Sequence, residues 1–265
     1  MCEDDTPNML LKFRFSNFRS FRTEQELSLI ASKLPGSGDG LFSPPGLKEQ
    51  VLPVAAIYGA NASGKTAVIG ALGFVAAAVK WSHAYWLPDT PFPAEPFAGD
   101  ARTVPSEFTV DLLLGGIRYQ YGFAANSQAI LREWLYVYPK RTKQAWFERV
   151  EDAPISFGCK MPGENKRIGG LTRKNSLFLS AAAQNNHEAL LPIYNWFSRL
   201  FAPVYAGGRS LSVIDEAEDI TALCKEEPDR AMITGCFPAP IWACPTCSWM
   251  KSPRVSAYPP PARGR

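Results

Sequence analysis

Eight consecutive residues have the types and the spacing needed to hold a phosphate group. They follow the pattern G-x-x-x-x-G-K-T, with small residues that let successive backbone N–H groups converge on phosphate oxygens. Lys65 supplies a positive charge for the β- and γ-phosphates, and the Thr66 hydroxyl is suited to coordinate Mg²⁺. We therefore predict a nucleotide-binding loop that consists of Gly59, Ala60, Asn61, Ala62, Ser63, Gly64, Lys65 and Thr66.

The segments on either side of this loop must position it. Residues 51–60, VLPVAAIYGA, are nearly all apolar, which predicts a strand that is buried on both faces. Residues 65–81 are rich in Ala and free of Pro, which predicts a helix. The N-terminus of that helix would face the bound anion. A strand, a glycine-rich turn and a helix, in this order, favour nucleotide binding over an incidental glycine-rich turn.

Hydrolysis of a bound nucleotide would also require an acidic pair at the end of a second buried strand. The candidates are Asp215 and Glu216, in the segment LSVIDEAED. Only Val213 and Ile214 directly precede the acids, whereas a buried strand has about four or more apolar residues. We therefore interpret the acids as the first turn of a helix. The sequence identifies no catalytic residue.

The cysteines and histidines do not indicate a metal site or a catalytic triad. Cys244 and Cys247 have the spacing of half a zinc site, but the remaining cysteines form no second pair with this spacing. We interpret all six as incidental thiols of a cytoplasmic protein. His83 belongs to no recognisable arrangement, and His187 is expected at the surface or in a helix cap.

Charge gives a weaker indication of partners. The formal net charge of the 265 residues is +3 and the pI is about 8.5, which does not by itself imply a nucleic-acid partner. The basic segments at 140–143 (KRTK) and 166–167 (KR) are interpreted as solvated loops, with nucleic-acid contact as the alternative. The sequence contains no apolar run of about 18 residues and starts with an acidic, polar segment, so we expect a cytoplasmic protein without a membrane span.

Before the loop, residues 10–21 alternate between apolar and polar types, which predicts a strand, and residues 24–32 predict a second strand paired with it. The Gly- and Pro-rich residues 33–50 predict a surface loop. After the helix, the Pro-rich residues 87–106 predict a connection between two regions.

The pattern then changes. Residues 107–158 predict a meander of antiparallel strands with a turn at Gly115–Gly116. Residues 160–174 predict a basic loop, and residues 176–201 predict a short strand followed mainly by helix.

These elements predict an α/β fold in three parts. Residues 9–86 would contain the first strands, the phosphate loop and its helix, and residues 107–230 the meander and the helical segment. Residues 231–265 combine Pro, Cys and Trp without any period, so we expect an irregular tail that is either disordered or the product of an out-of-frame reading.

The combination of two motifs resembles a known family. The segment FSNFRSF (15–21), a second strand and YGANASGKT (58–66) together resemble the ABC-type ATPases of the SMC, RecF and OLD kind. They are most similar to prokaryotic AAA-type ATP-binding proteins of abortive-infection and other phage-defence systems. The resemblance spans roughly residues 9–230, and the pairing of NFRSF (17–21) with the loop is its most specific part.

The resemblance implies a P-loop NTPase fold: the N-terminal lobe of an ABC/SMC-like head with an antiparallel β subdomain. It implies ATP and Mg²⁺ as cofactors, Gln184 as a second Mg²⁺ contact beside Thr66, and Arg19 near the nucleotide. The family's ABC signature, Walker B strand and switch histidine are not recognisable in this sequence. We therefore expect the N-terminal part of a longer ATPase, which could not complete its site by dimerising with itself.

Two functions remain open. In the first, ATP binding and hydrolysis drive the conformational changes of an ATPase head. In the second, a module that does not hydrolyse ATP binds ATP–Mg²⁺ and regulates a partner such as a nuclease. Self-association or a partner ATPase subunit is compatible with both. A small-molecule kinase is disfavoured, because the long meander is unlike the helical lids of such kinases.

Overall fold

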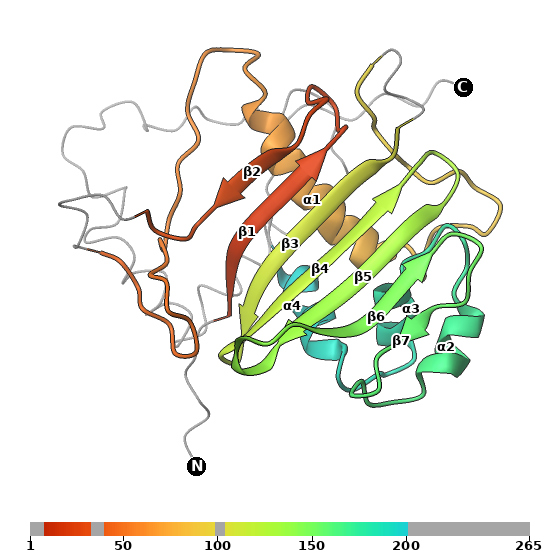
Figure 1. Ribbon diagram of the computed structural model, residues 1–265. Helices are drawn as coiled ribbons and strands as arrows, with labels where there is room; N and C mark the ends of the chain where they lie inside the picture. The colour runs from red at the N-terminus through yellow and green to blue at the C-terminus, as the bar shows by residue number, and fades with distance from the viewer. Residues whose placement is uncertain (1–7, 33–39, 99–103, 201–265) are drawn as a thin grey trace, which may run out of the picture. The chain divides into compact units, whose positions relative to one another are not determined.

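The computed structural model describes residues 8–32, 40–98 and 104–200 (Figure 1). In this part of the chain seven strands form one antiparallel sheet in the order β2-β1-β3-β4-β5-β6-β7. The strands are β1 (Met9–Ser16), β2 (Gln25–Ser28), β3 (Ser106–Leu114), β4 (Ile117–Ala125), β5 (Ile130–Tyr138), β6 (Gln144–Val150) and β7 (Ser156–Phe157). The helices are α1 (Lys65–Trp81), α2 (Asn165–Leu171), α3 (Phe178–Gln184) and α4 (Leu191–Arg199), and the turn η2 (Pro139–Arg141) links β5 to β6.

The predicted meander is confirmed in strands β3 to β7. Strands β3 and β4 pair without interruption from Ser106 with Ala125 to Leu114 with Ile117. The turn between them consists of Gly115 and Gly116, both at positive φ, as a tight hairpin requires. Because β1 pairs with β3, the first two strands belong to the same sheet as the meander. The division into domains at residues 86 and 107 stays a prediction.

The helices cover one face of the sheet. Figure 1 shows α1, α3 and α4 behind the strands, with α2 beside β7. Alternate residues of the strands point toward these helices and form the main core with them. Many of its members are aromatic side chains, most of them packed edge to face or tilted, with Phe13 stacked on Phe15. They are Phe13, Phe15, Phe18, Phe74, Phe108, Tyr121, Phe123, Phe147, Phe178 and Phe197. Burying a side chain of this kind stabilises the fold by about 1.5–3 kcal/mol.

A buried ion pair connects the sheet to α3. Glu133 of β5 is fully buried, and its carboxylate accepts hydrogen bonds from the backbone N–H groups of Phe178 (2.6 Å) and Leu179 (3.0 Å) at the start of α3. The Tyr121 hydroxyl donates to the same carboxylate at 3.0 Å. Arg149, opposite Glu133 on β6, lies 3.8 Å away and donates to the backbone carbonyls of 173, 174 and 176. Burial raises the pKa of Glu133, an effect that the Arg149 charge and the hydrogen bonds partly offset.

Several predicted elements differ in the structure. The prediction of a strand at residues 51–60 is wrong, because Val51 alone forms β-bridges there, to Ile30 and Phe42. Beyond Leu52 the segment has no regular secondary structure and is exposed, with Val54 67% and Tyr58 89% accessible. An apolar run forms a strand only where neighbours accept its backbone hydrogen bonds, and the described sheet does not extend to these residues.

The bounds of other predicted elements also differ from those in the structure. The strand predicted for 10–21 ends at Ser16, because Asn17 and Arg19 adopt positive φ and turn the chain. The basic loop predicted for 160–174 contains helix α2, and the strand expected after residue 176 is replaced by α3. The helix predicted for 65–81 is confirmed as α1.

The prediction of a surface position for His187 is wrong. The side chain is 5% exposed, and its Nε2 atom lies 2.8 Å from Asn165 Oδ1. Asn186, at φ 54°, turns the chain after α3, and the imidazole of His187 then lies against Asn165 at the start of α2. Residues Asp215, Glu216, Cys244 and Cys247 and the predicted tail 231–265 lie outside the described residues.

The substitution Glu133→Gln tests the buried ion pair. Glutamine replaces one carboxylate oxygen with an NH2 group, which cannot accept the backbone hydrogen bond made to that oxygen, and it leaves the Arg149 charge without its partner. We therefore expect a loss of about 3 kcal/mol in the free energy of unfolding. Urea unfolding followed by circular dichroism measures this loss. The control Glu148→Gln changes a carboxylate on β6 that accepts a single exposed bond from Tyr136, and should cost less than about 1 kcal/mol. Equal losses in both variants would contradict the anchoring role of Glu133.

His83 makes the stability depend on pH. Burial, and then the positive charge of Arg173, lower the pKa of this imidazole. The folded protein therefore binds fewer protons than the unfolded chain, so this contribution is present above the unfolded pKa of about 6.5 and is lost as the pH falls toward the folded pKa. We expect the difference in unfolding free energy between pH 7.5 and 5.5 to be smaller in His83→Asn than in the unchanged protein. The same difference in both would exclude His83 as the titrating group.

Candidate functional site

The predicted phosphate loop lies at the N-terminus of α1 and is exposed. Ala62 (φ 63°) and Gly64 (φ 91°) both have left-handed backbone conformations, and the Ser63 N–H donates to the Ala60 carbonyl at 3.3 Å. The Gly64 carbonyl accepts the first hydrogen bonds of α1, from Ala67 at 2.9 Å and Val68 at 3.2 Å. A turn with left-handed residues that leads directly into a helix is the backbone arrangement of an anion-binding concavity.

The charge at this end of α1 favours an anion. The 17-residue helix has no side-chain hydrogen bond at its N-cap, which is Gly64, and no acidic residue in its first turn. The partial positive charge of the first N–H groups is therefore not offset by a cap. A phosphate group placed here would receive hydrogen bonds from the backbone and the favourable end of the helix dipole.

Lys65 already lies within the loop. Its Nζ atom donates to the Gly59 carbonyl at 2.9 Å and to the Ala60 carbonyl at 2.6 Å, and lies 3.5 Å from Ser63 Oγ. These contacts hold the ammonium group across the turn that a phosphate would enter. Thr66 is exposed in the first turn of α1. The residues present therefore fit a nucleoside triphosphate with Mg²⁺.

The NFRSF segment packs directly against the loop and its helix. Phe18 and Phe21 exchange two backbone hydrogen bonds of 2.9 Å, which closes a tight turn after β1. A methyl group placed on Gly64 would lie 2.5 Å from the Phe21 ring, and one on Gly70 would lie 2.4 Å from Arg19 Nη1. The turn thus occupies the space that both glycines leave free. The sequence pairing of the two motifs reflects a physical contact.

An ion pair fixes Arg19 in this position. Its Nε and Nη2 atoms donate to the Glu95 carboxylate at 2.7 and 3.1 Å, and its backbone N–H donates to the Glu95 carbonyl at 2.8 Å. Arg19 therefore lies beside the second turn of α1, about 8 Å along the axis from Lys65. Sequence reasoning missed Glu95, because no pattern in the Pro-rich connection marks it.

The structure does not bring Gln184 to the loop. The residue is exposed at the end of α3, and α3 packs against the opposite end of α1, where the His83 N–H donates to Ser180 Oγ at 3.1 Å. Helix α1 is about 25 Å long, and α3 adds only about 6 Å beyond Ser180. The Mg²⁺ role of Gln184 stays a prediction that would require a rearrangement of α3.

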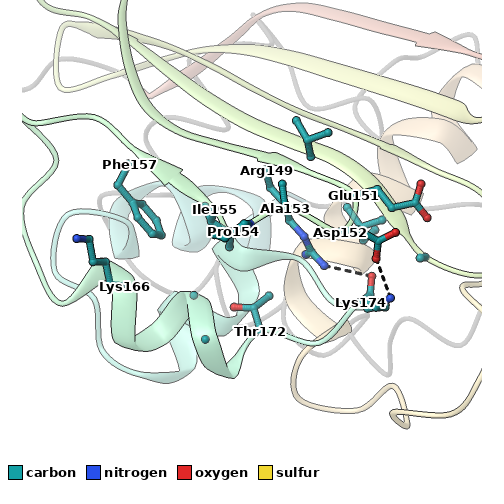
Figure 2. A pocket seen from close by; sticks show the side chains of 15 residues that line it. Arg149, Glu151, Asp152, Ala153, Pro154, Ile155, Phe157, Lys166, Thr172 and Lys174 are labelled. Atoms are coloured by element: carbon teal, nitrogen blue, oxygen red, sulfur yellow. Dashed lines mark hydrogen bonds and ion pairs between the residues drawn. The ribbon is translucent and has the colours of Figure 1, made fainter.

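A separate cavity of about 450 Å³ lies between the end of β6, the following turn and α2 (Figure 2). Its walls include Ile130, Val150, Pro154, Ile155, Phe157 and Gly169. Arg149 lines it as well, but its guanidinium group is occupied by backbone carbonyls, and Lys174 at the edge donates to Asp152 at 2.9 Å. None of the lining residues belongs to the phosphate loop. In residues 8–32, 40–98 and 104–200 no group of three His, Cys, Asp or Glu side chains could hold a metal ion, and no helix could cross a membrane.

Comparison with known proteins identifies the family. Residues 54–219, more than half of the chain, match the family described as "AAA domain, putative AbiEii toxin, Type IV TA system". No curated protein and no solved structure gives a match. The chain belongs to this AAA domain family, which agrees with the family resemblance of the sequence motifs and implies a P-loop NTPase.

The substitution Gly64→Ala tests how tightly the loop is built. Alanine would have to adopt a φ of 91° and would contact the Phe21 ring, so we expect a loss of about 1–3 kcal/mol in the free energy of unfolding. Urea unfolding measures it. The control Gly170→Ala places a methyl group in open space on helix α2, where alanine is favoured, and should be neutral or slightly stabilising. If Gly64→Ala is as stable as this control, the loop does not hold the conformation described.

Proposed function

We propose that this member of the AAA domain family binds ATP with Mg²⁺ through Gly59, Ala60, Asn61, Ala62, Ser63, Gly64, Lys65 and Thr66. The observation that carries the proposal is the uncapped N-terminus of α1, where Gly64 and Lys65 stand at the end of a left-handed turn. Each residue of the motif has a role that its position permits. Backbone N–H groups would bind the phosphates, and the Thr66 hydroxyl would hold Mg²⁺. The Lys65 ammonium group would donate to a phosphate oxygen in place of one of the backbone carbonyls that it now contacts.

We further propose that the described residues form the N-terminal lobe of an ABC/SMC-like ATPase head. Three features support this role: the antiparallel sheet, the helix α1 packed on it, and the NFRSF turn against Gly64 and Gly70. In such a head, Mg²⁺ bound with ATP neutralises the phosphate charge. The Phe21 contact would then transmit a change in the loop to β1, because the ring lies between the loop and the end of that strand.

A module that binds ATP but does not hydrolyse it is the second candidate. It is favoured by the sequence, in which no Walker B strand and no ABC signature are recognisable. Under this proposal the nucleotide would control a partner.

The family description names a type IV toxin–antitoxin system, which suggests the setting. We propose that the chain acts in the cytoplasm with a partner of such a defence system, either an ATPase subunit or a nuclease. Self-association is the alternative arrangement. Thermal-shift and turnover measurements test ATP binding and ATP hydrolysis without requiring the partner to be known.

We expect ATP with Mg²⁺ to raise the melting temperature of the purified chain, because a ligand that binds only the folded state stabilises it by mass action. At a ligand concentration 100 times the Kd the gain is about 2.7 kcal/mol. Lys65→Ala should abolish the shift, whereas Lys160→Ala, which removes an exposed lysine elsewhere, should preserve it. Thr66→Val should retain a shift that no longer depends on Mg²⁺. A folded protein without any ATP effect would contradict the proposal.

Steady-state phosphate release separates the two candidate functions. Turnover that Lys65→Ala abolishes would exclude the module without hydrolysis. ATP binding without turnover would support that module for this chain acting alone.

A further inference from the structure

The face of the sheet opposite the helices carries a group of aromatic and basic side chains. The side chains that alternate with the core residues point away from α1, α3 and α4, and in the described part of the chain no helix covers them (Figure 1). Along β5 these side chains are Arg132, Trp134, Tyr136 and Tyr138. Aligned with them on the neighbouring strands are Arg118, Gln120 and Arg14. The face therefore combines aromatic rings with cations.

Each of the three rings on β5 lies under a cation. Arg132 lies 5.3 Å from the centre of the Trp134 ring, Lys143 lies 3.5 Å from Tyr136, and Arg118 lies 5.0 Å from Tyr138. Trp134 is almost buried, because its ring lies across Gly122 of β4, where a methyl group would come within 2.4 Å. It forms the base of the surface, whereas Tyr136 and Tyr138 are partly exposed.

The turn beside these tyrosines holds two more cations at a cost in backbone strain. In η2, Lys140 and Arg141 have φ values of 51° and 68°, and the Thr142 N–H donates to the Pro139 carbonyl at 3.2 Å. Both central residues at positive φ define the backbone of a type I′ turn, for which Asn-Gly is the favoured sequence. Long side chains adopt this region rarely. The chain keeps two basic residues where the backbone favours Asn and Gly.

The acidic groups of this face are already paired. The Asp111 side chain is buried and accepts hydrogen bonds from Arg118 at 2.8 Å and Gln120 at 3.2 Å, with Arg14 4.0 Å away. Glu148 accepts the Tyr136 hydroxyl at 2.6 Å, and Glu26 pairs with Lys12 at 3.1 Å. The exception is Glu107, near the start of β3, which lies at the opposite end of the strand from η2. Around Tyr138 the exposed charges are therefore cations.

We propose that this face, from Tyr136 and Tyr138 to the turn η2, binds single-stranded nucleic acid. The tyrosine rings would stack on bases, and Arg118, Lys140, Arg141 and Lys143 would contact phosphates. Side chains two residues apart on a strand are about 7 Å apart, whereas stacked bases of a duplex strand are 3.4 Å apart. Tyr136 and Tyr138 therefore match bases that are splayed apart, as in single strands, and not a stacked duplex. An acidic protein would match the cations but would give the exposed rings no flat partner.

The test measures fluorescence anisotropy of labelled 15-nucleotide oligo-dT and oligo-U, of a 15-base-pair duplex, and of labelled heparin, with the purified chain at several salt concentrations. The double variant Lys140→Asn/Arg141→Gly removes both cations and supplies the favoured turn residues. We expect it to melt at a temperature equal to or higher than that of the unchanged protein. Its affinity for the preferred single strand should fall at least tenfold, and the slope of log K against log salt should decrease by about 1.4.

Two further variants identify the source of the binding energy. Tyr138→Leu keeps every charge, so it should weaken oligonucleotide binding several-fold and leave heparin binding unchanged. Lys166→Gln/Arg167→Gln removes the same charge from exposed positions of α2 and should change binding less than threefold. Preference for oligo-dT or for oligo-U would identify DNA or RNA as the ligand.

Three results would overturn the proposal. The first is an equal loss of oligonucleotide affinity in the η2 and α2 double variants. The second is binding of the duplex or of heparin as tight as binding of the single strand. The third is an unchanged oligonucleotide affinity in the Tyr138→Leu variant. The second result would instead indicate a general polyanion surface, such as one for an acidic protein. All variants should keep the ATP-dependent melting shift, so the outcome does not depend on the phosphate loop.

Discussion

The fold of the proposed nucleotide site depends on the contact between Phe21 and Gly64. A phosphate loop needs a residue at positive φ before its helix, and Gly64 at φ 91° provides it, but glycine alone cannot hold a loop in place. The Phe21 ring fills the space where a β-carbon would be and packs edge to face against Phe15 of β1. Phe21 and Phe15 therefore connect the loop to the end of β1 and hold it in place. The ion pair between Arg19 and Glu95 then holds the turn that carries Phe21.

A second anchor holds the other end of α1. Glu133 provides the acceptor for the first N–H groups of α3, and α3 and its preceding segment bind Ser82 and His83 at the end of α1. The buried carboxylate thus acts as a cap supplied by the sheet, which compensates for the absence of a capping side chain within α3. Helix α1 is fixed at one end by the NFRSF turn and at the other by this network. Helix α1 therefore keeps its position on the sheet, although the partial positive charge at its N-terminus is not offset by a cap and the loop there is exposed.

Local patterns predicted the meander and helix α1, because glycine turns, alternation and helix propensity act within a few residues, whereas the phosphate-binding role of residues 59–66 stays a prediction. The alternation of β5 also places Glu133 on the inward face with Leu135 and Val137, and a carboxylate there requires a buried partner. Other features could not be read locally. Residues 51–60 are apolar enough for a buried strand, yet strand formation depends on neighbours that the segment itself does not specify. His187 is buried because a turn at Asn186 directs it under a helix that was expected to be a loop.

The exposed segment before the loop limits what the described residues can do. Val54, Ile57 and Tyr58 leave large apolar surfaces accessible, and no strand of the described sheet pairs with them. Clustered exposed apolar side chains beside the proposed phosphate loop are typical of an interaction surface. On its helix side the loop is fixed by Phe21 and Arg19. On its strand side the last residue in a β-bridge is Val51, and the last backbone hydrogen bond runs from the Leu52 N–H to the Leu29 carbonyl, seven positions before Gly59. Binding a phosphate needs only the helix side. Transmitting force from the nucleotide needs both sides, so the proposed head requires a further strand beside residues 52–58, whichever chain provides it.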